Sequence, residues 1–259
     1  MNSKEYINTY YKTVILVLFV IATGAYGYSN LNYNWQWYRV PDYIVLIENG
    51  RLFKGLLVKG LIITLKISFI SLILTAIIGF STAFMRLSSS PVLKFATITY
   101  IEIVRNTPLL IQLFLIYFVI SPVIGLSPFF SAVIALSLFE GAYASEMIRS
   151  GILSIPKGQW EASYSLGLST TDTYVTVVMP QVMRQGLPML AGQSVSLVKD
   201  SALVSTISIF DLTMQGQSIV SKTFLTFEIW FTVAFMYFCI TASLSLLIAR
   251  FEKRLNYHV

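Results

Sequence analysis

The sequence predicts an all-α integral membrane protein with about six transmembrane helices. Three observations support this fold class: 56% of the 259 residues are hydrophobic, only 12% are charged, and long apolar runs recur along the chain. Soluble domains carry about 25% charged residues, roughly twice this fraction. Only helices and closed barrels satisfy their backbone hydrogen bonds inside lipid, and apolar runs of this length are helices.

Six apolar runs are candidate spans, and the first and fourth are barely long enough to cross a bilayer core of about 30 Å. They lie at roughly residues 12–28, 58–85, 95–120, 128–150, 185–210 and 226–250. Before the second run, the aromatic segment NYNWQWY suits a membrane surface, where Trp and Tyr are enriched. The basic residues at 51–59, within RLFKGLLVKG, predict an amphipathic interfacial helix that leads into this run.

The distribution of Lys and Arg predicts that both termini are cytoplasmic, because loops on that side retain an excess of these residues. With the N-terminus inside, ten of them fall in inner segments: Lys4, Lys12, Arg86, Lys94, Arg149, Lys157, Arg184, Arg250, Lys253 and Arg254. Five fall in outer segments: Arg39, Arg51, Lys54, Lys59 and Lys222. This bias explains the net charge of +6, so we do not expect a nucleic-acid partner.

The residue content argues against an enzyme. With one cysteine, Cys239, and one histidine, His258, the chain has no basis for an internal disulfide, a His/Cys metal site or a Ser/His/Asp triad. A phosphate-binding loop needs the pattern G-x-x-x-x-G-K-[ST], and the chain contains no Gly-Lys dipeptide. We therefore expect no cofactor on this chain.

The longest inner loop, at about residues 150–184, predicts two short helices joined by a glycine turn. Pro156 suits a first helical turn, and Gly167 suits the left-handed position that ends a helix. One of residues 169–171 can cap the second helix, which we expect Pro180 to end. Such a unit is too small to bury a core, so it is either a docking element or a solvated connector.

Charged residues inside the spans are costly in lipid and are the candidates for a substrate pathway. These candidates are Glu140, Lys199, Asp200, Ser201 and Arg105. Glu140 can bind a substrate ammonium or pair with Lys199. Lys199 and Asp200 follow a run broken by glycines and a proline, and they offer complementary charges to a zwitterion or form a polar clamp between helices. Lys66 should face the bundle or a cavity.

Glu102 and Arg105 are three residues apart and share a helix face, near the inner end of the third run. They either form a structural ion pair or reach out to lipid headgroups, or they are part of an inner gate.

The loop resembles the EAA motif of importer permeases of the ATP-binding-cassette class, E-A-A-x3-G-x9-I-x-L-P. Here Glu161, Ala162 and Ser163 precede Gly167, and the segment ends in VVMP at Pro180. Ser163, Val177 and Met179 depart from the motif but keep its small or apolar character. Three further segments resemble the polar amino-acid branch of these permeases: YIEIVRNTPLLIQLFLIYF (100–118), FEGAYASEMIRSGI (139–152) and SLVKDSALVSTISIFDL (196–212).

The resemblance covers most of residues 55–254 and implies a five-helix type I importer permease core with one extra N-terminal span. Residues 1–55 would hold the tail, the extra span and the external aromatic segment, and residues 255–259 a cytoplasmic tail. The core would occupy residues 56–254, with a coupling hairpin at about 155–180 that docks into an ATPase. The coupling residues would be Pro156, Gly158, Glu161, Ala162, Ser163, Gly167 and Pro180.

The implied function is that of a transmembrane permease subunit in a bacterial cytoplasmic (inner) membrane. It would import polar amino acids such as glutamate, glutamine or arginine. Its partners would be two ATPase subunits that bind ATP and Mg, a second identical or similar permease chain and an external solute-binding protein. Two alternatives remain at this point: an ion-driven secondary transporter, and a membrane scaffold whose hairpin is a docking arm.

Overall fold

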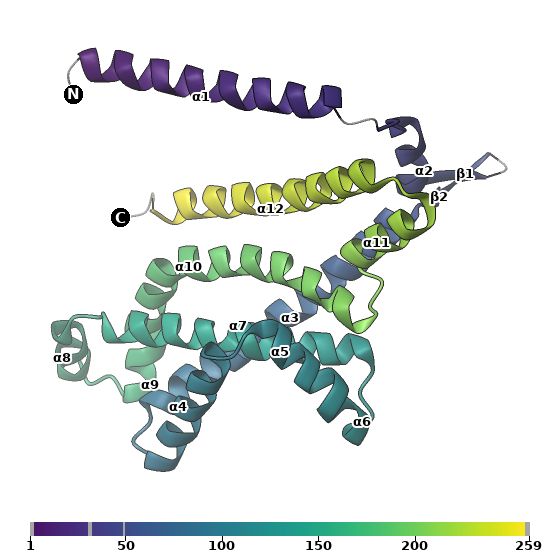
Figure 1. Ribbon diagram of the computed structural model, residues 1–259. Coiled ribbons are helices and arrows are strands. Elements are labelled where there is room, and N and C mark those ends of the chain that lie inside the picture. Colours follow the sequence, from purple (N-terminus) through teal and green to yellow (C-terminus); the bar gives the residue numbers. More distant parts are fainter. Residues whose placement is uncertain (1–2, 31–32, 49, 257–259) are drawn as a thin grey trace. The chain divides into compact units, whose positions relative to one another are not determined.

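The computed structural model describes residues 3–30, 33–48 and 50–256 and is mainly helical (Figure 1). The tail predicted at 255–259, with His258, lies almost wholly outside the described residues. The chain divides into two compact units, residues 1–37 and 38–259, and each is described by itself. The first unit holds α1 (Ser3–Asn30), which contains the predicted span 12–28. It also holds an aromatic group in which the Trp35 and Trp37 rings stack at 6.1 Å.

The second unit opens with four short elements that hold the start of the first long helix. They are the 3-10 turn η1 (Trp37–Arg39), whose first residue still belongs to the first unit, α2 (Val40–Ile44) and the antiparallel strands β1 (Val45–Glu48) and β2 (Arg51–Lys54). Val45 pairs with Lys54, and Glu48 pairs with Arg51. The interfacial helix predicted at 51–59 is therefore wrong over its first turn.

Backbone packing explains why this helix starts late. The N–H of Gly55 donates to the carbonyl oxygen of Ile44 at 2.9 Å. A Cβ atom at Gly55 would lie only 2.3 Å from the backbone of Tyr43, so no other residue fits this crossing. The strand Val45–Glu48, apolar except for Glu48, pairs with β2, and that pairing takes precedence over the helical pattern.

The remaining elements of the second unit are helical. The first half contains α3 (Leu56–Leu87), α4 (Pro91–Arg105), α5 (Leu109–Phe114), the π-helical η2 (Leu115–Ile120), α6 (Ser121–Ile124) and α7 (Pro128–Leu153). The second half contains α8 (Lys157–Ser165), α9 (Thr170–Asp172), the π-helical η3 (Thr173–Val178), α10 (Met179–Asp200), the 3-10 segment η4 (Ser201–Ile207), α11 (Leu212–Thr223) and α12 (Thr226–Asn256).

Three helices in the described part are long and apolar enough to cross a membrane: α3, α7 and the Thr226–Phe251 part of α12. The pair Pro91–Arg105 and Leu109–Ile124 qualifies together as a fourth, but it bends by 108°. The predicted count of six spans is not confirmed. The run at 185–210 is divided between α10 and η4, and polar residues along α10 lower its hydropathy. In α1 the apolar stretch is shorter.

The core of the second unit forms around α7, which packs against α3 more extensively than any other two elements pack together. Small residues allow this approach: a Cβ atom at Gly79 of α3 would lie 2.8 Å from the Cβ of Ala144 on α7. Ile67, Leu113, Leu136 and Val204 fill the space beside the pair. Since α7 is the helix that other helices surround, its polar residues face protein rather than lipid.

A second cluster fixes α11 between α3 and α12, and Asp211 is its polar centre. The N–H of Met214 donates to Oδ1 of Asp211 at 2.9 Å, which caps α11, and the Tyr237 hydroxyl donates to Oδ2 at 3.3 Å. The N–H of Leu212 donates to Oγ1 of Thr64 at 3.1 Å. These bonds tie three helices together at one end of the second unit.

Candidate functional site

A pocket of about 310 Å³ lies between α7 and α10. The residues that line it are Phe139, Glu140, Tyr143 and Met147 from α7, and Gln193, Ser196 and Asp200 from α10. Each helix contributes a stripe at i, i+3 and i+7, which is the spacing of one helix face. The two stripes face each other, so this pocket is the place where polar residues of the apolar α7 meet those of α10.

The interior of the pocket is acidic. Glu140 is only 3% exposed, and its carboxyl group lies within hydrogen-bonding reach of the Asp200 carboxyl. The side-chain amide of Gln193 donates to the backbone oxygen of Glu140 at 2.7 Å, which fixes α10 against α7. The other end of that amide, Oε1, is buried without a hydrogen-bond partner in the described part of the chain. The pocket therefore offers the carboxyl groups of Glu140 and Asp200 as acceptors that a cation would satisfy.

A positive charge lies at the edge of this pocket. Arg105, the last residue of α4, places its guanidinium 5.4 Å from the centre of the Tyr143 ring. This distance is that of a cation–π contact, and it holds the charge against Tyr143, one of the lining residues. Acidic groups inside and a basic group at the edge are the arrangement that a zwitterion needs.

The structure brings some of the predicted pathway residues together and separates others. Glu140 and Asp200 share the pocket, and Arg105 borders it. Lys199 is exposed outside the pocket lining. Ser201 is fully buried and donates to the carbonyl oxygen of Val198 at 2.7 Å, which is a local structural bond.

The remaining predicted charges have other surroundings. Within the described residues, neither a Glu140–Lys199 nor a Glu102–Arg105 ion pair is present. Glu102 accepts a hydrogen bond from the side chain of Asn106 at 3.0 Å. Lys66 is exposed on α3 rather than buried in the bundle.

Sequence reasoning missed the uncharged lining residues Tyr143, Gln193 and Ser196. The signal was available, because Tyr143 follows Glu140 by three positions and Gln193 and Ser196 precede Asp200 by seven and four. Helical spacing selects them once the two carboxylates are known to face each other.

The predicted hairpin is present, and its glycine turn is confirmed. Pro156 directly precedes α8, which runs to Ser165. Gly167 has a φ of +79°, and its N–H donates to the carbonyl oxygen of Tyr164 at 3.0 Å. Leu168 donates to the carbonyl oxygen of Ser163 at 3.1 Å, which completes a helix-ending motif that favours glycine.

The second arm of the hairpin begins as predicted but does not end as predicted. Ser169 caps α9, because its hydroxyl accepts the N–H of Asp172 at 3.1 Å. Pro180 does not end this arm; it lies in the first turn of α10, which continues to Asp200. The wider π-helical turn of η3 precedes the proline, and a proline is tolerated where its missing N–H is not needed.

The base of the hairpin is fixed to α3 and α7 by an apolar cluster. Its buried members are Ala83, Ile148, Ile152, Ile155, Val178 and Val182. The Tyr174 ring contacts Trp160 at 5.1 Å and Phe84 of α3 at 5.9 Å, and burial raises the pKa of the Tyr174 phenol. The rest of α8 is open: Gly158, Glu161, Ala162, Tyr164 and Leu166 are exposed.

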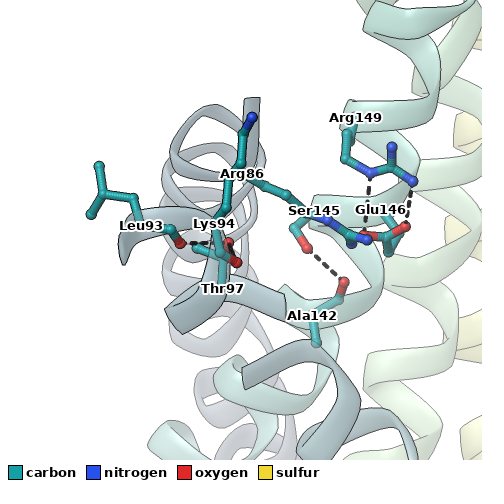
Figure 2. A network of polar contacts seen from close by, with 8 residues as sticks. All are labelled: Arg86, Leu93, Lys94, Thr97, Ala142, Ser145, Glu146 and Arg149. Carbon is teal, nitrogen blue, oxygen red and sulfur yellow. Dashed lines mark hydrogen bonds and ion pairs between the residues drawn. The ribbon is translucent and has the colours of Figure 1, made fainter. Parts of the chain in front are cut away.

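Beside this cluster, a charged network joins α3 to α7 (Figure 2). Arg86 near the end of α3 forms an ion pair with Glu146 of α7. Arg149, one turn further along α7, binds the same carboxylate with an N–O distance of 3.0 Å. All three side chains are between a fifth and about a quarter exposed.

The fold, the pocket between helices and the protruding hairpin define a membrane-embedded transport subunit. The chain belongs to the family described as the binding-protein-dependent transport system inner membrane component, which matches residues 75–257. It is similar to the L-cystine transport system permease protein TcyB of Bacillus subtilis (strain 168). The two are 39% identical over 209 residues, which cover 80% of this chain and 89% of that protein.

Another relative is the glutamine transport system permease protein GlnP of Escherichia coli (strain K12). It is 36% identical over 204 residues, which cover 78% of this chain and 93% of GlnP. The crystal structure of an amino acid ABC transporter with histidines has a TM-score of 0.71 and 38% identity, and the match covers 77% of this chain and 94% of that one. The MetNI methionine ABC transporter shares the fold, with a TM-score of 0.66 and 20% identity.

These likenesses confirm the predicted importer-permease family and its type I fold. The chain is a multi-pass membrane permease, and nothing in the comparisons supports the ion-driven secondary transporter.

Proposed function

We propose that this permease carries polar amino acids in zwitterionic form through the pocket between α7 and α10. The observation that carries the proposal is the pairing of buried Glu140 with partly buried Asp200 in the pocket, with Arg105 against the lining residue Tyr143. The named relatives are permeases for L-cystine and glutamine, which agrees with a zwitterionic substrate.

The pocket matches the two charged ends of an amino acid. An ammonium group has three N–H donors, and the carboxyl oxygens of Glu140 and Asp200 can accept them in the pocket. Two carboxylates this close repel each other, and an ammonium between them relieves that repulsion. The substrate carboxylate then lies toward Arg105, whose guanidinium can bind it with two parallel hydrogen bonds.

We further propose that the hairpin couples transport to ATP hydrolysis on a separate chain. The open face of α8 holds Gly158, Glu161 and Ala162, while its base is fixed to the helices that carry the pocket. Pro156 and Gly167 fix the two ends of α8, Ser163 packs its inner side, and Pro180 begins α10. ATP and Mg would bind the partner ATPase, because this sequence lacks a phosphate-binding loop.

The assembly we propose contains two ATPase subunits, this permease with an identical or similar second permease, and an external solute-binding protein. The Lys and Arg bias argues that both termini and the hairpin face the cytoplasm of a bacterial cell. The hairpin and the ATPase would then lie on the side where ATP is available.

Uptake by the reconstituted importer tests the pocket. With Glu140→Gln or Asp200→Asn, we expect uptake of the transported amino acid to fall by about tenfold or more, because a charge-assisted hydrogen bond to its ammonium is lost. Asp42→Asn, an exposed carboxylate outside the pocket, is the matched control and should leave uptake unchanged. Normal uptake by both pocket variants would show that the acidic pair is structural.

A further inference from the structure

We propose that Arg86 and Glu146 are positioning residues that clasp α3 to α7, so that both helices move with the hairpin as one body. The proposal rests on the function proposed for the hairpin. In this proposal, the Arg86–Glu146 ion pair transmits movement of the hairpin to the pocket. Neither residue lines the pocket or lies on the open face of α8.

The contacts single out one bond of the network. Both ion pairs found in the described part of the chain end on the Glu146 carboxylate (Figure 2). The pair with Arg149 lies within α7, at a spacing of three residues, so it cannot hold two helices together. The pair with Arg86 crosses from α7 to α3, and it is the bond that separation of the helices would break.

The clasp lies between the two sites that must communicate. Along α7, the pocket residue Tyr143 comes before Glu146, and Ile148 and Ile152 of the hairpin-base cluster come after it. α3 follows the same path: Gly79 packs closely against α7, and Ala83 enters the hairpin-base cluster before Arg86. A movement of the hairpin base thus reaches the α7 side of the pocket through the segment that the clasp holds, while α10 carries it to the other side.

The charges around Arg86 show why the Glu146 carboxylate is needed where α3 and α7 meet. The charged neighbours that act on Arg86 include Arg149 and Arg105, which repel it, and Glu102, which attracts it. Without the Glu146 carboxylate, Arg86 and Arg149 would face each other in a partly buried place with their shared counter-charge gone. Arg86 would then keep only the attraction of Glu102 against the repulsion of Arg149 and Arg105, which weakens the hold of α3 on α7.

The test is the number of solute molecules moved per ATP hydrolysed by the reconstituted importer. We expect Arg86→Gln and Glu146→Gln to lower this ratio by about fivefold or more, while ATP hydrolysis continues, since coupling energies between sites span this range. Arg149→Gln is the matched control, because it removes a bond to the same carboxylate within one helix; its ratio should stay within about twofold.

Exchange of the charges separates a clasp from a merely structural pair. The double variant Arg86→Glu with Glu146→Arg restores an ion pair between the helices, so it should recover most of the lost ratio. The proposal would be overturned if Arg86→Gln moved as many solute molecules per ATP as wild type. It would also be overturned if this ratio fell as far in Arg149→Gln as in Arg86→Gln. Failure of the exchanged pair to recover any coupling would also count against it.

A second measurement keeps this inference separate from the function of the hairpin. If no ATPase accompanies the wild-type chain, the proposed function fails, but the clasp can still be measured in the purified full chain. The thermal midpoints of Arg86→Gln, Glu146→Gln and the combined variant Arg86→Gln with Glu146→Gln form a mutant cycle. The clasp predicts that the combined variant loses less than the sum of the single losses. Strict additivity would overturn the clasp.

Discussion

α7 and α12 are both long apolar helices, yet they occupy opposite environments in the second unit. In its most apolar part α7 is 61% buried and α12 is 11% buried, although α12 is the more hydrophobic of the two. A soluble protein would show the reverse order. Lipid removes the hydrophobic drive to bury apolar side chains, so the helix with more small and polar residues goes to the centre. The pocket, the clasp and the connection to the hairpin all lie on α7.

The largest stability difference between these helices should come from matched leucines. Leu136 on α7 is 1% exposed, whereas Leu246 on α12 is 63% exposed. We expect Leu136→Ala to cost about 2–5 kcal/mol, because it leaves a cavity between helices. Leu246→Ala faces lipid that can fill the space, so its cost should be below about 0.5 kcal/mol. Thermal midpoints of the two purified variants measure the difference, and equal losses would break the comparison.

A smaller effect should follow from overpacking the α3–α7 contact. Gly79→Val places a Cβ atom 2.8 Å from that of Ala144, and the two helices must separate to admit it. We expect destabilisation of about 1–3 kcal/mol. Gly24→Val in α1 is the control, since among the described residues no atom beyond its own helix backbone and sequence neighbours lies within 4 Å of the added Cβ. A Gly79→Val chain as stable as wild type would show that the close approach is not needed.

The parts of the fold that could be predicted from the sequence are those set by residues close together along the chain. The apolar runs became α3, α7 and α12, and the glycine turn at Gly167 and the cap at Ser169 are local features. The β1–β2 hairpin was missed because its strands are stabilised by pairing with each other and by the crossing at Gly55, which an amphipathic pattern does not report.

The candidate pocket was predictable only in part. Glu140 and Asp200 stand out as charges within apolar runs, but they are sixty residues apart, and their meeting depends on how α7 packs against α10. Lys199 is adjacent to Asp200 in sequence, yet helix geometry turns it away from the pocket. Pro180 lies in the first turn of α10 instead of ending a helix because a π-helical turn precedes it, and no pattern in the sequence indicates that turn.

The central claim, that the hairpin couples this permease to a separate ATPase, is tested most directly by co-purification. The tagged chain, gently extracted from its native membrane, should bring down an ATPase with a phosphate-binding loop. Gly167→Trp should remove the ATPase but leave the chain in the membrane, because it puts a bulky side chain into the left-handed turn at the open end of α8. Gly125→Trp, at another left-handed glycine with open space around it, is the control and should retain the ATPase.

Presence of the ATPase with wild type and Gly125→Trp, and its loss with Gly167→Trp, is the result this account predicts. A wild-type chain without an ATPase, or a Gly167→Trp chain that retains it fully, would contradict the coupling role of the hairpin.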